Sequence, residues 1–85
     1  MEKLEPIYDG RKSFYGKAKT YRDSQENLIL HSYNTDVAMI TPEGNLVLYG
    51  FYSATTTRHI REFAKQYIEV KPWTRKELEE ALLEA

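Results

Sequence analysis

The sequence predicts an α+β fold, in which an antiparallel four-stranded β-meander is followed by two α-helices in a single domain. Apolar and polar residues alternate through much of residues 13–51, which is the period of strands. The links between these segments are two to four residues long, and such short links join antiparallel neighbours because parallel strands need long crossovers. Beyond residue 51 the apolar spacing changes to three and four residues, the period of a helix.

Four short segments, bounded by turn-forming residues, are the expected strands. They cover residues 13–22, 27–33, 36–41 and 46–51. The turn Pro42–Asn45 is the clearest link, because it begins with proline and places a glycine where positive φ is needed. Residues 1–12 show no period and contain Pro6 and an Asp-Gly pair, so an N-terminal arm is expected there, with the α+β domain over residues 13–85.

The first helix is expected over about residues 57–68, with one apolar stripe made of Ile60, Phe63, Ala64 and Tyr67. The charged residues of this helix are expected to lie mostly away from the stripe: Arg58, Arg61, Glu62 and Lys65. The stripe is expected to pack on one face of the sheet, which would carry Leu28, Leu30, Ala38, Ile40, Leu46 and Leu48.

The second helix is expected over about residues 75–84. Thr74–Glu77 matches a capping box, and Trp73 and Leu78 stand at the two positions of a hydrophobic staple. About ten residues are too few for a helix that is stable alone in water. This helix must therefore dock on its own sheet or on another subunit.

Composition excludes several classes of site. The chain has no cysteine and two histidines, so a disulfide framework and a cysteine-based metal site are excluded and a histidine-rich one is not expected. No nucleophile-elbow, Walker or dinucleotide-binding motif occurs. We therefore expect a protein that is not an enzyme and needs no cofactor or metal, with structural roles for His31 and His59.

Hydropathy and charge indicate the cellular compartment and the kind of partner that the protein could bind. No apolar run approaches the roughly 20 residues of a membrane span, and the charged N-terminus lacks a signal-peptide core, so a cytoplasmic protein without a membrane partner is expected. Residues 10–71 carry nine Lys or Arg against six Asp or Glu, whereas the segments on either side are each net negative by two. A mildly basic body is compatible with a nucleic-acid partner but does not demand one.

The segment GFYSATTTRHIREF, residues 50–63, joins the last expected strand to the first helix. A helix needs one hydroxyl as its cap, and this segment offers four, together with cations at the end where the helix dipole favours an anion. One reading is an anion or nucleic-acid site formed by Thr55, Thr56, Arg58, His59 and Arg61. The other reading is an ordinary capped helix start whose arginines form ion pairs.

A second candidate is a basic, aromatic row on one face of the first expected strand. The row consists of Tyr15, Lys17, Lys19 and Tyr21. Exposed aromatics and cations on a sheet can stack bases and hold phosphates. Tyrosines can equally cover a small core or build a dimer surface.

The chain also resembles a family of small uncharacterised proteins encoded by bacteriophages and prophages. The resemblance covers about residues 28–66 and rests on a Ser-Tyr-x-Thr-x-Val-Ala strand and a Tyr-Ser-x-Thr-Thr-x-Arg-His-Ile segment. The matching residues are Ser32, Tyr33, Thr35, Val37, Ala38, Tyr52, Ser53, Thr55, Thr56, Arg58, His59 and Ile60. The resemblance implies a phage origin, and hence the cytoplasm of a host bacterium, but brings no activity.

These observations lead to two expected functions. The first is a small phage-type accessory module that contacts nucleic acid or another anion at the Thr55–Arg61 helix start. The second is a protein–protein interaction module, either a host-enzyme inhibitor or a homodimer, that uses the tyrosine-rich sheet face and the C-terminal helix.

Overall fold

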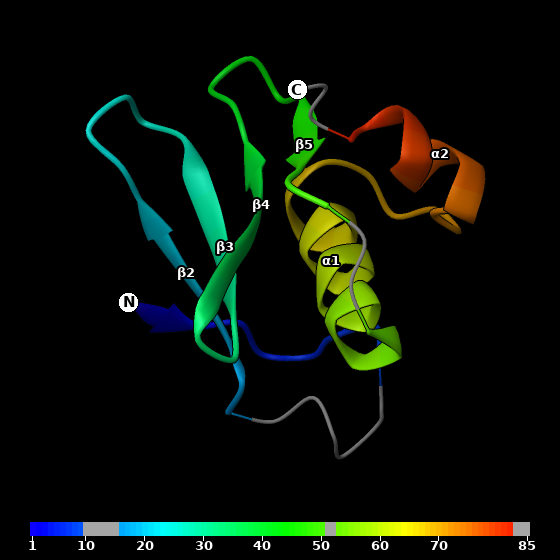
Figure 1. Ribbon diagram of the computed structural model, residues 1–85, viewed down its shortest axis with the longest axis horizontal. Helices are drawn as coiled ribbons and strands as arrows, with labels where there is room; N and C mark the ends of the chain where they lie inside the picture. The colour runs from blue at the N-terminus through cyan, green and yellow to red at the C-terminus, as the bar shows by residue number, and fades with distance from the viewer. Residues whose placement is uncertain (10–15, 51–52, 83–85) are drawn as a thin grey trace.

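A computed structural model describes residues 1–9, 16–50 and 53–82 and shows a single α+β domain. The five strands are β1 (Glu2–Lys3), β2 (Ala18–Arg22), β3 (Leu28–Ser32), β4 (Thr35–Ile40) and β5 (Leu46–Leu48). They form one antiparallel sheet in chain order. The helices are α1 (Ala54–Tyr67) and α2 (Arg75–Glu80). Both helices lie on the same side of the sheet, and the opposite face, which neither helix covers, is named the open face (Figure 1).

The sheet has five strands, so the prediction of four was wrong. The additional strand, β1, lies in the segment predicted to be an arm, and it pairs Glu2 with Thr20 and Lys3 with Lys19. Leu4 extends this pairing, because its backbone nitrogen donates to the carbonyl of Ala18 over 2.9 Å. Two residues are too few to show an alternating pattern, so the sequence alone could not reveal this strand.

The four predicted strands are present, and three of them, β2, β3 and β5, are shorter than predicted, whereas β4 keeps the predicted length and is displaced by one residue. β2 begins at Ala18, because Gly16 and Lys17 form a turn in which Gly16 adopts a φ of 75°. Residues 13–15 of the predicted strand lie outside the described residues, as does Phe51 at the end of the last one. Within β2 the predicted alternation is confirmed, since Ala18 is buried and Lys19 is exposed.

The core lies between the sheet and the helices. It consists of Leu4, Ala18, Leu28, Leu30, Val37, Ala38, Ile40, Leu48, Ile60, Phe63 and Leu78. Leu46, which was expected in this core, is only partly buried against it. Val37 was not expected there, and it joins because the pairing of β3 with β4 shifts register between Leu30 and His31. Such a bulge redirects the side chains that follow it.

Helix α1 begins at Ala54, three residues earlier than predicted, because Ser53 is its N-cap. The Ser53 hydroxyl accepts a hydrogen bond from the backbone nitrogen of Thr56 over 3.3 Å. The stripe of Ile60, Phe63 and Ala64 is buried as predicted. Tyr67 is 47 % exposed and does not belong to the core, because the last turn of α1 reaches the edge of the sheet.

Helix α2 has the predicted capping box, with Thr74 as N-cap and Glu77 as its reciprocal partner. It ends at Glu80 rather than near residue 84, and residues 83–85 lie outside the described residues. The chain then joins β5, since the backbone nitrogen of Leu48 donates to the carbonyl of Ala81 over 2.8 Å. Leu78 is buried in the core, so α2 docks on its own domain, and Leu82, just beyond the helix, pairs with Leu48 at the β5 edge.

Neither described helix has the length and apolar character needed to cross a bilayer.

Candidate functional site

The α1 residues predicted to bind an anion do not form one cluster. Thr56 and His59 are buried and face strand β3. Thr55 and Arg58 are partly exposed at a different angle around the helix. Arg61 is also partly exposed, and its Nε donates to the carbonyl of Trp73 over 2.9 Å, which ties α1 to the segment that leads into α2. Thr56 and His59 thus hold α1 to β3, and Arg61 holds it to the segment before α2. Only Thr55 and Arg58 are left partly exposed without such a described contact to another element.

The buried part of this segment is a hydroxyl–imidazole cluster. The Ser32 hydroxyl lies 2.8 Å from Nδ1 of His59 and 3.1 Å from the Thr56 hydroxyl. Burial lowers the pKa of His59, the charge of Asp9 opposes that shift, and the charge of Lys17 adds to it. A serine beside a histidine can be a nucleophile and its base. Here Ser32 is only 2 % exposed and His59 is fully buried, so the pair holds α1 to β3.

Glu62 is a second buried polar residue, so the prediction that it lies away from the buried stripe was wrong. One carboxylate oxygen accepts hydrogen bonds from the backbone nitrogens of Tyr8 (2.8 Å) and Asp9 (2.9 Å). The other oxygen accepts from the Gln66 amide, which also donates to the carbonyl of Glu5 over 2.7 Å. Glu62 is 2 % exposed. It therefore fixes residues 5–9 against α1.

The open face of the sheet carries a row of basic residues. Lys19 of β2 lies directly opposite Lys3 of β1 on one side and His31 of β3 on the other. Directly opposed side chains on one face stand about 4.5–5.5 Å apart at Cβ. Lys17, in the turn before β2, places its ammonium 5.4 Å from the centre of the Tyr33 ring. Lys3 was not predicted, because the strand that positions it was not.

The basic row ends at a hydrogen-bonded triad. The Tyr21 hydroxyl donates to Asp36 over 2.6 Å, and Nδ1 of His31 lies 2.9 Å from the other carboxylate oxygen. The hydrogen bond to Asp36, followed by burial, raises the pKa of Tyr21 to about 12. Burial acts to raise the pKa of Asp36, but the hydrogen bonds from Tyr21 and His31 outweigh it and lower that pKa. The triad therefore keeps the Tyr21 phenol protonated and the Asp36 carboxylate ionised.

Tyr21 and Tyr49 lie on the open face, and Tyr33 lies at the end of the sheet, near α1. Tyr21 is partly exposed, Tyr49 is 38 % exposed and Tyr33 is 45 % exposed. Tyr33 lies in the turn between β3 and β4 with a φ of 56°, which is costly for an aromatic residue and brings its ring to 5.9 Å from that of His59. The fourth predicted member of the basic aromatic row, Tyr15, lies outside the described residues.

An apolar row crosses the same face beside the tyrosines. Ile29 of β3 is opposite Met39 of β4, which is opposite Val47 of β5. Ile29 is buried by its neighbours, whereas Met39 and Val47 are partly exposed. The open face is therefore basic at β1–β2 and apolar at β4–β5.

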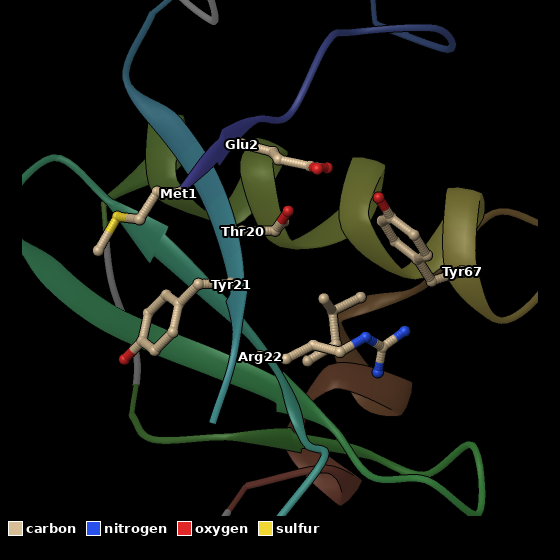
Figure 2. Close-up of a pocket in the computed structure, with 7 residues that line it drawn as sticks. Met1, Glu2, Thr20, Tyr21, Arg22 and Tyr67 are labelled. Atoms are coloured by element: carbon tan, nitrogen blue, oxygen red, sulfur yellow. The ribbon is translucent and has the colours of Figure 1, made fainter. Parts of the chain in front are cut away.

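A pocket of about 390 Å³ lies beside the N-terminal end of β1, where β2 extends past its partner strand. Figure 2 shows that Glu2, Thr20, Arg22 and Tyr67 extend on the side of β2 that faces α1, whereas Tyr21 points to the other side. Leu28 also lines the pocket. No local sequence pattern indicates this pocket, because its residues come from distant parts of the chain.

Within residues 1–9, 16–50 and 53–82, no three His, Asp or Glu side chains are grouped so that they could hold a metal ion.

A family model described as a family of unknown function (DUF8033) matches residues 2–80. Comparison with curated proteins and with solved structures found no significant match.

Proposed function

Because the chain belongs to DUF8033, a family of unknown function, we propose a function from its surface alone. The protein is a non-catalytic module that binds single-stranded nucleic acid on the open face of its sheet. Lys3, Lys17 and Lys19 contact phosphates, and the exposed tyrosines stack on bases. The observation that carries the proposal is the direct cross-strand pairing of Lys3 with Lys19 on a face that neither helix covers.

The lysine pair favours a polyanion for an energetic reason. Like charges directly opposite each other destabilise a sheet by a few tenths of a kcal/mol to about 1 kcal/mol. Among the described residues, no acidic side chain forms an ion pair with Lys3 or Lys19. A phosphate backbone placed across β1 and β2 removes this repulsion and releases its own counterions.

The tyrosines supply the second part of such a surface. A base stacked on an aromatic side chain contributes roughly 1–3 kcal/mol, and the contribution is similar for different bases. The Tyr21 phenol stays neutral in any ordinary buffer, because its pKa is raised to about 12. A neutral ring beside lysines suits an anionic strand.

Thr55 and Arg58 of α1 form the remaining part of the predicted anion site. Thr55 and Arg58 make a separate, weaker contact with the anion, since Thr56 and His59 are engaged with Ser32. This contact is tested separately from the open face by Arg58→Ala.

The test is fluorescence anisotropy with short labelled DNA and RNA single strands at low and moderate salt. We expect affinity that falls as salt rises and a loss of about tenfold or more in the Lys3→Ala/Lys19→Ala variant. The matched control is Lys65→Ala/Lys76→Ala, which removes two lysines from the helices and should bind as the wild type does. Absence of binding at tens of micromolar protein, or equal losses in both double variants, would refute the proposal.

A protein partner is the second candidate, and the apolar row favours it. Met39 and Val47 are partly exposed beside Tyr49, and exposed aromatic and methionine side chains are enriched at protein interfaces. Helix α2 already packs on its own sheet, so the open face is the surface left for such an interface. Light scattering tests a homodimer, and a Val47→Asp variant that lowers the observed mass to one chain would support it. A monomer of about 10 kDa in the wild type removes the homodimer.

A bacteriophage or prophage origin accords with either function, because a small accessory module acts by contact with a host or phage macromolecule. Recovery of the gene from phage genomes would support this origin.

A further inference from the structure

The pocket at the sheet edge is lined by side chains of opposite charge together with hydroxyl and apolar groups. Glu2 supplies a carboxylate, Arg22 a guanidinium, and Thr20 and Tyr67 hydroxyls, around an apolar floor at Leu28. In Figure 2 the Tyr67 hydroxyl lies on the same side of β2 as Glu2 and Thr20, with the Arg22 guanidinium extending below the tyrosine. We propose that this pocket binds a guanine nucleotide.

The fold sets the spacing of the two charges. Glu2 lies directly opposite Thr20, and Arg22 is two residues further along β2 on the same face. Diagonal neighbours of this kind stand about 7–8 Å apart. Within the described part of the chain no ion pair holds Glu2 or Arg22, and Arg22 makes only a long hydrogen bond of 3.3 Å to the Glu26 carbonyl. Both charges can therefore meet a ligand.

The ligand must bring donors to Glu2 and an anion to Arg22. Guanine presents two adjacent N–H donors, at N1 and at the 2-amino group, which match the two oxygens of one carboxylate. Adenine presents an unprotonated ring nitrogen at the corresponding position, which a carboxylate repels. A nucleotide phosphate suits the guanidinium of Arg22.

Tyr67 offers a surface on which the base can stack, and the pocket is large enough for a mononucleotide. The Tyr67 ring is half exposed, and its ring centre lies 5.6 Å from that of Phe63, which supports it from within the core. A supported, exposed ring is a platform for stacking. The volume of about 390 Å³ falls within the range of small-molecule sites.

The pocket is separate from the basic row of the open face, so this inference stands without the proposed function. The guanine can come from a free mononucleotide or from a nucleotide within a single strand. The two sources share the same recognition chemistry and are distinguished by testing them side by side.

The experiment is a titration of the ¹⁵N-labelled protein, followed by NMR, with GMP, AMP, guanosine and a short single strand that carries one guanine. We expect GMP to shift resonances of Glu2, Thr20 and Tyr67, and AMP to bind at least tenfold more weakly. Guanosine should bind more weakly than GMP in the wild type and equally to it in Arg22→Gln. If only the strand shifts the resonances of Glu2, Thr20 and Tyr67, the source is a nucleic acid.

Glu2→Gln is the decisive variant, because glutamine replaces one of the two acceptor oxygens with a donor. It should lose the preference for GMP over AMP, whereas Glu43→Gln, in the turn between β4 and β5, should keep it. Glu2 and Glu43 are both exposed, and the NMR spectrum shows directly whether each variant is folded. Equal affinity for GMP and AMP, or no shift with GMP or the strand at millimolar concentration, overturns the proposal. The Lys3→Ala/Lys19→Ala variant should still bind GMP, so the failure of one proposal is distinguishable from the failure of the other.

Discussion

The carboxylate of Glu62, in the middle of α1, accepts a hydrogen bond of 2.8 Å from the backbone nitrogen of Tyr8, 54 positions earlier in the chain. A second bond to the nitrogen of Asp9 makes the same oxygen a clamp on the segment that follows β1. Residues 5–9 belong to none of the described strands, and this clamp and the contact of Gln66 with Glu5 hold them against α1.

Replacement of Glu62 by alanine should release this segment. It removes a buried acceptor of several hydrogen bonds, and a loss of about 3 kcal/mol in the free energy of unfolding is expected. Denaturant unfolding measures the loss, and hydrogen exchange should show that the Tyr8 and Asp9 amides become unprotected before the sheet does. Glu43→Ala, on an exposed turn, should change neither. Unaltered protection of Tyr8 in Glu62→Ala would show that the clamp is not needed.

Stability should fall as pH decreases through the range in which histidine titrates. The pKa of His59 is lowered in the folded state, so below about pH 6.5 the unfolded chain binds a proton that the folded chain does not. Folding is then opposed by up to about 1.4 kcal/mol per pH unit. The charge of Asp9, in the segment after β1, raises the pKa of this imidazole. The charge of Lys17, in the turn before β2, lowers it.

The measurement is urea unfolding at about pH 7.5 and about pH 5 for the wild type and for His59→Gln. The variant should be less stable at the higher pH but should lose less stability between the two values. An identical pH dependence in both proteins would assign the effect to other groups.

Ser32→Ala should destabilise the junction between α1 and β3. The Ser32 hydroxyl is the shared partner of Thr56 and His59, so alanine leaves both without this partner inside the protein. A loss of about 1–3 kcal/mol is expected. Thr55→Ala, on a partly exposed neighbouring position, is the matched control, and a cost in Ser32→Ala no greater than in that control would contradict the structure.

Loss of the triad contact at Tyr21 should appear in urea unfolding as a loss of stability at neutral pH that disappears at low pH. The folded-state pKa of Asp36 is lowered, so Asp36 contributes stability above its unfolded pKa of about 3.9, and this contribution is lost as pH falls through the folded value. Tyr21→Phe removes one of the hydrogen bonds that lower this pKa. The variant should be less stable at neutral pH by about 1 kcal/mol and should approach the wild type in acid.

Leu78→Ala should detach α2 from the sheet. Leu78 is 4 % exposed and packs in the core, so its truncation should cost roughly 2–5 kcal/mol. Thr74→Ala removes only the cap and should cost about 1 kcal/mol. Thermal unfolding of the two variants should rank them in that order, and the reverse order would mean that α2 is held by its cap rather than by its packing.

Local pattern was sufficient for much of the fold. The capping box at Thr74 and the stripe of Ile60, Phe63 and Ala64 depend on neighbours within one helix, and both are confirmed. The start of α1 was placed three residues too late, because several hydroxyls competed as caps and geometry selected Ser53. Helix and turn signals act over three or four residues, so a single sequence contains them.

The features that the sequence could not supply all depend on pairing between distant segments. Whether Glu62 faced solvent or the core depended on where residues 5–9 run, and Lys3 became part of a basic row only because β1 pairs with β2. The edge pocket likewise joins Glu2 to Tyr67. The sequence by itself determined an antiparallel sheet with two capped helices, because hydrophobic period and short links are local properties. Only the tertiary structure decided which polar groups are buried as clamps and which face solvent, because strand register and chain crossing are not encoded in local spacing.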